Sequence, residues 1–257
     1  MKERLITLCL ALAALLCFYV LLFPKAGGNL PKSKPLSTDA GPDGYLAAWR
    51  WLSNGHIPLA SLRERYPGLS SPEVAPAASG NVLIMALPQQ LPFKAAEWDS
   101  LEEWVLQGNT LVILAALDDT PQWTLDDGNP DPQPALRRIS RMSFTALGAP
   151  PSVGDWLEPK TIESVPQGQH PLLSGVKSLY AISDLPASRW SAHNLQESLS
   201  LRIARRADAG VGVLWLKAVG RGQIIVCAFA SLLSNRAIDQ ADNALLLSNI
   251  IARTPRE

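Results

Sequence analysis

The chain has 257 residues, with 23 lysines and arginines against 23 aspartates and glutamates, so its formal net charge is zero. Because no basic excess is available to neutralise phosphates, the composition argues against a nucleic-acid-binding protein. Hydrophobic residues make up 47% of the chain and charged residues 18%, which excludes a disordered protein, and three cysteines are too few for a disulfide framework.

The first predicted element is a membrane anchor. Residues 5–23 form an uncharged, apolar run of 19 residues. At about 1.5 Å per residue, a helix of this length spans roughly the 30 Å of a bilayer core. A cleavable signal peptide is the alternative, but its apolar run is usually only about 7–15 residues long and ends at a small-residue cleavage site. The following Pro-Lys-Ala-Gly-Gly is a poor cleavage site, so we expect an uncleaved anchor over residues 1–23.

The orientation of this anchor follows from the lysines and arginines that flank it. Lys2 and Arg4 precede the apolar run and favour a cytoplasmic N-terminus. Lys25, Lys32 and Lys34 follow the run and favour the opposite orientation. Since a short basic tail before a first helix normally stays inside, we expect a single-pass protein of the inner (cytoplasmic) membrane whose soluble part is periplasmic.

A tether and a folded domain are predicted after the anchor. Residues 24–43 contain four prolines and three glycines and are expected to form the tether, and residues 44–257 the α/β domain. Within the domain, the apolar spacing predicts a helix over residues 45–53 and a first strand over 57–62. The continuous apolar run at 81–87 predicts a strand that is buried on both faces.

A strand–helix–strand unit is the clearest pattern of the domain. After the strand at 81–87, helical spacing of apolar residues covers 94–107, and a second buried strand is predicted over 110–117. Such a unit predicts a right-handed crossover between two parallel strands. Residues 118–134, with five aspartates and four prolines, are predicted to form a loop.

The second half of the chain is predicted to be mostly strand. Strands are expected over residues 141–147, 161–165, 179–183, 198–205, 212–219 and 223–230. A tight turn at 220–222 joins the last two, and a helix is expected over 239–252. The fold class is therefore a three-layer, flavodoxin-like α/β domain. Its sheet is expected to be parallel at the centre with an antiparallel hairpin at one side.

Three segments together carry a resemblance to a known family. They are EWDSLEEWVLQGNTLVIL at 97–114, HPLLSG at 170–175, and GRGQIIVCAFASLLSNRAIDQADNALLLSNII at 220–251. Over about residues 37–253 the chain resembles a bacterial membrane-anchored family described as domain of unknown function 4350. The resemblance implies a class I glutamine amidotransferase-like fold, an N-terminal membrane helix and often a second one at the C-terminus. This sequence shows no such C-terminal helix, and the resemblance leaves open whether one has been cut away.

The motifs of an enzyme or of a cofactor site are not found in the sequence. An amidotransferase needs a nucleophilic cysteine on a sharp turn after a central strand, but the strand at 110–117 is followed by Asp118. Cys227 lies inside a predicted strand, where a cysteine is ordinarily a small hydrophobe. A Gly-x-Ser-x-Gly motif is absent, and the three histidines have no partner at metal-ligand spacing. No catalytic residue, cofactor or metal is therefore predicted, and the resemblance supplies no catalytic residues either.

A candidate ligand or partner site is predicted from position alone. In open parallel sheets, ligands bind outside the carboxyl ends of the strands. The polar residues expected near these ends and near the start of the last helix are Asp118, Ser234, Asn235, Arg236, Asp242 and Asn243. In the structural alternative, Asn235 and Asp239 only cap and order the turn, and Arg236 pairs with Asp242.

Three functions are compatible with these patterns. The leading one is a non-enzymatic interaction or assembly module of the cell envelope, held at the membrane by its anchor. The family resemblance adds an expected protein partner, because family genes often neighbour those of a MoxR-type AAA ATPase system. The alternatives are a small-molecule-binding domain that serves a membrane transporter, and a hydrolase or transferase that uses the polar crevice.

Overall fold

A computed structural model describes residue 12 and residues 33–62, 66–71, 77–89, 91–125, 130–148, 159–184, 188–194 and 199–252. The chain divides into two compact units, Met1–Lys32 and Ser33–Glu257. The anchor predicted over 5–23 lies outside the described residues, apart from Leu12. Within the described part, no helix is both long enough and apolar enough to cross a membrane.

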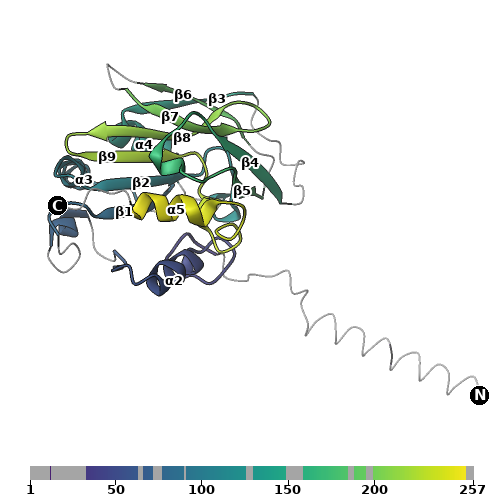
Figure 1. Ribbon diagram of the computed structural model, residues 1–257, viewed down its shortest axis with the longest axis horizontal. Coiled ribbons are helices and arrows are strands. Elements are labelled where there is room, and N and C mark those ends of the chain that lie inside the picture. The colour runs from purple at the N-terminus through teal and green to yellow at the C-terminus, as the bar shows by residue number, and fades with distance from the viewer. Residues whose placement is uncertain are drawn as a thin grey trace, which may run out of the picture. The chain divides into compact units, whose positions relative to one another are not determined.

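A seven-stranded mixed sheet forms the centre of the second unit (Figure 1). Its strands follow one another across the sheet as β1 (Val82–Leu87), β2 (Thr110–Ala115), β9 (Gly222–Cys227), β8 (Gly212–Val219), β7 (Leu201–Arg206), β4 (Lys160–Pro166) and β5 (Leu179–Ser183). The pairs β1–β2 and β2–β9 are parallel. All four remaining neighbouring pairs are antiparallel.

The predicted position of the parallel strands is therefore wrong, although the mixed α/β class is confirmed. The parallel strands form one end of the sheet, and the antiparallel strands make up the rest of it rather than a single hairpin at one side. The physical reason lies in burial. All six residues of β2 are buried, but so are the first four residues of β8 and the last four of β9, which pair antiparallel. An apolar run indicates that a strand is buried on both faces, but it does not indicate whether the strand is parallel or antiparallel to its neighbours.

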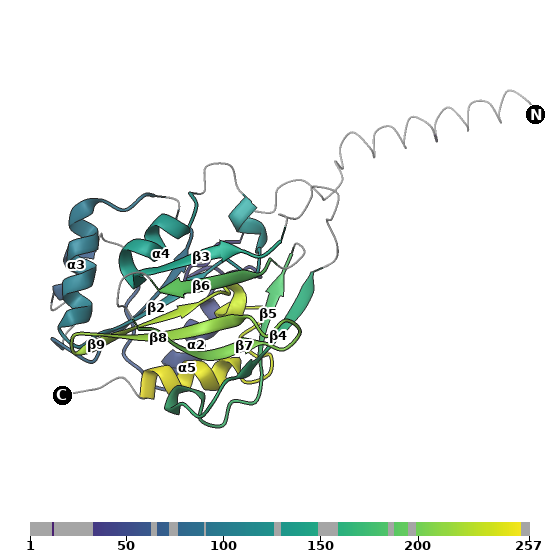
Figure 2. The same ribbon diagram turned by 90° about the horizontal axis from the view of Figure 1, so that it is seen from above.

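Helices cover both faces of this sheet. They are α2 (Leu46–Asn54), α3 (Ala95–Leu106), α4 (Gln133–Ser140) and α5 (Asn243–Ala252). Figure 2 shows α3 and α4 on one side of the sheet and α5 on the other. A separate antiparallel ribbon of β3 (Met142–Ala146) and β6 (Trp190–Asn194) lies on the side of α4. Phe144 of β3 packs edge-on against Trp215 of β8, with ring centroids 5.3 Å apart.

Most other predicted elements are confirmed, and four details differ. Residues 57–62 form no strand; Ile57, Leu59 and Leu62 instead pack against the core as an irregular segment. Helix α4 begins inside the predicted loop, and β6 was not predicted. The last helix begins at Asn243 rather than at residue 239, because residues 239–242 form turns and Ala241 has a φ of 44°.

The turn between β8 and β9 is fixed against the end of α3. Gln223 N donates to Asn109 O at 3.2 Å, and Arg221 N donates to Leu106 O at 3.3 Å. A side chain at Gly222 would collide with two backbone oxygens, those of Val105 and Asn109. Glycine is therefore required at this position by close backbone approach rather than by an unusual φ.

We predict that Gly222→Ala lowers the free energy of unfolding by about 1–3 kcal/mol or more, since the hairpin and α3 must move apart. Gly55→Ala is the matched control, because a Cβ there would come no closer than 3.3 Å to any atom, Leu52 O being the nearest. Urea unfolding of both variants measures the difference. Equal stability of the two variants would contradict the close approach.

Candidate functional site

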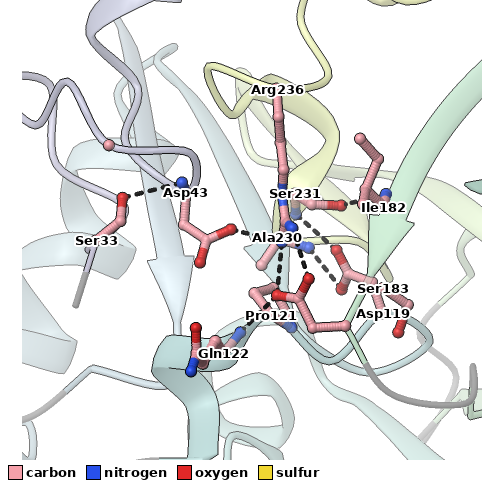
Figure 3. Close-up of polar contacts among 12 residues, drawn as sticks. Ser33, Asp43, Asp119, Pro121, Gln122, Ile182, Ser183, Ala230, Ser231 and Arg236 are labelled. Carbon is pink, nitrogen blue, oxygen red and sulfur yellow. Dashed lines mark hydrogen bonds and ion pairs between the residues drawn. The ribbon is translucent and has the colours of Figure 1, made fainter. Parts of the chain in front are cut away.

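Two chain segments meet at the carboxyl ends of the parallel strands. One is the C-terminal loop that follows β9, and the other is the N-terminal segment 33–47, which ends in the first turn of α2. We define the strand-end cluster as Asp43, Asp119, Asp184, Asn235 and Arg236, which join these two segments to the sheet. Figure 3 shows the Asp43 and Arg236 side chains directed toward each other, with Asp119 close by.

Arg236 forms ion pairs with two aspartates from distant parts of the chain. Its Nη2 lies 2.6 Å from Asp43 Oδ1. Its Nη1 and Nη2 also donate to Asp184 Oδ1 and Oδ2 at 2.6 and 2.8 Å, a bidentate arrangement. The Asp43 side chain is 6% exposed and the Arg236 side chain 19%. One guanidinium thereby connects the N-terminal segment, the end of β5 and the C-terminal loop.

Burial dominates the ionisation of Asp43. It raises the pKa of the Asp43 carboxyl to about 6; the Arg236 guanidinium opposes this shift and the Asp184 carboxylate adds to it. The Asp43 and Arg236 side chains are both largely buried, so removing either one would leave the charge of the other buried and uncompensated.

Asn235 fixes the N-terminal segment with its side-chain amide. Its Nδ2 donates to Asp39 O at 2.9 Å and to Gly41 O at 2.6 Å. Its Oδ1 accepts from Ala47 N at 2.7 Å, which satisfies one of the free N–H groups in the first turn of α2. Asn235 therefore does cap a helix, but the helix is α2 rather than the C-terminal helix that the capping alternative proposed.

Asp119 joins the exits of β2 and β9. The side chain is completely buried, and it accepts from Ala230 N at 2.9 Å and from Ser231 N at 2.6 Å. Burial raises the pKa of Asp119 to about 7, against the opposing effect of its hydrogen bonds from Ser231 and Ala230. The Ser231 hydroxyl in turn accepts from Ile182 N at 2.9 Å, so β5 is connected to the same point.

Asp118 precedes Asp119 in the chain but contacts a different arginine. Its Oδ2 lies 3.6 Å from Arg206 Nη1, and both residues are buried. Arg206 is held in a bidentate pair by Asp208, at 2.9 and 2.7 Å, and donates to Ser188 O at 2.8 Å. Burial raises the pKa of Asp118 to about 7; Arg206 lowers it and Asp119 adds to the increase.

The other predicted site residues all make internal contacts. Asp242 accepts from Lys177 N at 2.7 Å and Ser178 N at 3.2 Å, and these bonds lower its pKa. It does not pair with Arg236, so that part of the structural alternative is wrong. Asn243 is completely buried and bonds both Tyr180 N and Tyr180 O. Ser234 is also completely buried; its Oγ has no hydrogen-bond partner among the described residues, and its backbone O accepts from Ala237 N and Ile238 N.

The structure therefore brings Asn235 and Arg236 together. Asp118 pairs with Arg206, and Asp242 accepts from backbone groups at 177 and 178. Asn243 donates to Leu232 O and Ala237 O of the same C-terminal loop. Sequence reasoning missed Asp43 and Asp184 as the partners of Arg236. Asp184 follows a predicted strand directly, so the rule about strand ends could have found it. Asp43 was assigned to the end of the tether, and no local signal marks it.

The chemistry available at these residues is that of ion pairs and backbone hydrogen bonds. Among the residues that the structure describes, no three histidine, cysteine or acidic side chains are placed to bind a metal ion. The Cys227 thiol is buried in β9, and burial raises its pKa far above the usual value, which makes it a poor nucleophile.

Comparison with known proteins places the chain in a family and identifies structures of similar fold. Residues 37–251 match the family described as "Domain of unknown function (DUF4350)". The structure described as "mmIFT52 N-terminal domain" is similar with a TM-score of 0.53 and 10% identity, over 82% of this chain and 91% of that one. "Cytoplasmic Protein STM1381 from Salmonella typhimurium LT2" is similar with a TM-score of 0.51 and 11% identity, over 85% and 89%. At these identities the likeness concerns the fold alone, and no curated protein matches the chain.

The raised pKa of Asp118 gives the protein a testable pH dependence. The folded state holds this proton up to about pH 7, whereas an unfolded aspartate releases it near pH 4. The contribution of Asp118 to stability is therefore lost as the pH rises from about 4 to about 7. We predict that Asp118→Asn, which cannot ionise, becomes more stable relative to the wild type over this interval and that the difference is constant above it.

Denaturant unfolding at pH 4, 5, 6, 7 and 8 measures this difference. Asp239→Asn is the matched control, because Asp239 is exposed, and its difference from the wild type should not follow the same course. A stability difference for Asp118→Asn that is independent of pH would contradict the burial of an ionisable Asp118.

Proposed function

The chain belongs to the family described as "Domain of unknown function (DUF4350)", and we propose that it is a membrane-anchored, non-enzymatic interaction or assembly module of the bacterial cell envelope. In this proposal residues 5–23 hold the protein in the inner membrane as a single-pass anchor. The folded unit lies on the periplasmic side. Its partners are proteins of a MoxR-type AAA ATPase system, as the gene neighbourhoods of the family imply.

The observation that carries the proposal is the docking of segment 33–47 on the carboxyl end of the sheet. In open α/β sheets this end is the usual place for a ligand or substrate. Here Asn235 and Arg236 use their polar groups to hold the chain's own N-terminal segment. That segment is the one that leads from the predicted anchor to the fold. This docking fixes the segment that follows the predicted anchor to the folded domain. Such an arrangement supports an assembly module rather than an enzyme with an open catalytic crevice.

The environment of Cys227 also supports a non-enzymatic role. The family resemblance implies an amidotransferase-like fold, which we retain as part of the proposal. A catalytic cysteine of that fold would stand exposed on the turn after a central strand. In this chain β2 is followed by Asp118 and Asp119, both fully buried, and Cys227 lies inside β9 with a raised thiol pKa.

The test is isolation of the tagged full chain from membranes that have been washed with high salt. We expect the protein to stay in the membrane fraction and to co-purify with components of the MoxR-type system. The Cys227→Ala variant should co-purify with the same components, at a cost of about 1 kcal/mol in stability. The Cys227 thiol of the folded protein should resist labelling by iodoacetamide.

Three results would contradict the proposal, and the first two would each indicate a different function. Turnover of an ester or amide panel that is lost in a stable Cys227→Ala chain would indicate an enzyme. Stabilisation by a transported metabolite, with no protein co-purifying, would indicate a binding domain of a transporter. A protein that high salt releases from the membrane would remove the anchor.

A further inference from the structure

A small cavity lies far from the strand-end cluster, between α3, α4 and the β8–β9 hairpin. Its volume is about 170 Å³. Its apolar lining comes from α3 and the hairpin, and includes Leu101, Val105, Val219 and Ile224, with Ile139 of α4. A cavity of about 150 Å³ lined by apolar side chains is enough to hold a benzene ring. This cavity is therefore large enough for one six-membered ring.

Cationic side chains gather around the same cavity. Arg138, Arg141 and Lys217 all line it, together with one carboxylate, Glu102. Arg138 pairs with Glu102 and Asp99, each at 3.0 Å, and Arg141 lies 3.4 Å from Glu102. The three cationic side chains therefore have only two neighbouring carboxylates, Glu102 and Asp99, and the Asp99 side chain is 72% exposed.

Lys217 carries the unmatched positive charge. Among the described residues no carboxylate forms an ion pair with it, and its Nζ donates to Ser140 O at 3.0 Å. That bond uses one of the three ammonium donors. Burial lowers the pKa of Lys217, and the neighbouring Arg141 lowers it further, against the effect of Glu102. A carboxylate placed beside Lys217 and Arg141 would relieve this repulsion and receive a charge-assisted hydrogen bond.

We propose that this cavity binds a small monocarboxylate with a flat or branched apolar body, of about the size of benzoate. The apolar body occupies the space above Leu101 and Ile224. The carboxylate lies at the mouth and accepts hydrogen bonds from Lys217 and Arg141. The site is independent of the strand-end cluster and of the proposed assembly role.

A purely structural role for Lys217 is the alternative. The carbonyl groups at the end of α4 attract a cation, and Lys217 could serve only to cap them through Ser140. In that case the substitution of Lys217 would lower the thermal midpoint and would not change ligand binding. The two roles therefore differ in a measurable way.

The experiment uses ¹⁹F NMR of 4-fluorobenzoate with the full chain in nanodiscs of zwitterionic lipid, with empty nanodiscs as the blank. We expect saturable line broadening with the wild type. Lys217→Met should weaken binding by about tenfold or more, because it removes the charge-assisted bond and keeps the length of the side chain. Val219→Trp should abolish binding by filling the cavity, because alternate residues of β8 share a face and Val219 lies on the face of Lys217.

Two controls are needed. One distinguishes the effect of the ligand's charge from that of its shape, and the other distinguishes binding in the cavity from attraction to surface lysines. Neutral 4-fluorobenzamide has nearly the same shape and should not bind measurably. Lys160→Met removes an exposed lysine on β4, outside the cavity, and should bind 4-fluorobenzoate like the wild type. Absence of saturable binding to the wild type would overturn the proposal. Equal binding by Lys217→Met or Val219→Trp would do so as well.

Discussion

The Arg236 guanidinium, held between Asp43 and Asp184, is the interaction on which the arrangement of the strand ends depends. It connects an N-terminal segment, the end of β5 and the C-terminal loop, which no local interaction could bring together. Its partly buried position makes it sensitive, because a buried cation or carboxylate that loses its partner is costly. The Asn235 amide and the Asp119 carboxylate add hydrogen bonds to backbone groups of the same segments. Backbone groups that would otherwise be unsatisfied at this edge of the sheet are thereby bonded.

This arrangement gives the carboxyl end of the sheet a different role from the usual one. Asp119, Asn235 and Arg236, which an open α/β sheet would present to a ligand, are directed into the protein and bind its own chain. The proposed assembly role builds on that fact, since the segment that comes from the predicted anchor is part of the folded unit from residue 33 onward. The proposed carboxylate site lies elsewhere, between α4 and the β8–β9 hairpin, where Lys217 forms no ion pair with any described carboxylate. The two sites are built from separate residues, so the loss of one leaves the other intact.

The elements that the sequence predicted well are those with a strong local pattern. The apolar run of β2, the helical spacing of α3 and the turn between β8 and β9 all depend on residues close in the chain. The parallel strands were misplaced because an apolar run is equally compatible with β2, which is parallel to both neighbours, and with β8, which is antiparallel to both. Helix α4 is amphipathic, but it is only eight residues long and begins inside the segment rich in prolines and aspartates that was predicted as a loop; strand β6 is only five residues long. Arg236 and Asn235 were found from their position, but their partners lie far along the chain, as Ala47 does at 188 positions from Asn235.

Amide hydrogen exchange of residues 36–47 tests this account most directly. Asp43→Asn removes the N-terminal arm of the ion-pair system and leaves the pairing of Arg236 with Asp184 in place. The account predicts that the amides of Tyr45 and Ala47, which are hydrogen-bonded in the docked segment, exchange at least about tenfold faster in this variant, while β2 and β9 keep their protection. Asp239→Asn, which changes an exposed aspartate, should leave the exchange of the segment unaltered. Wild-type protection of residues 36–47 in the Asp43→Asn chain would contradict the dependence of the docked segment on Arg236.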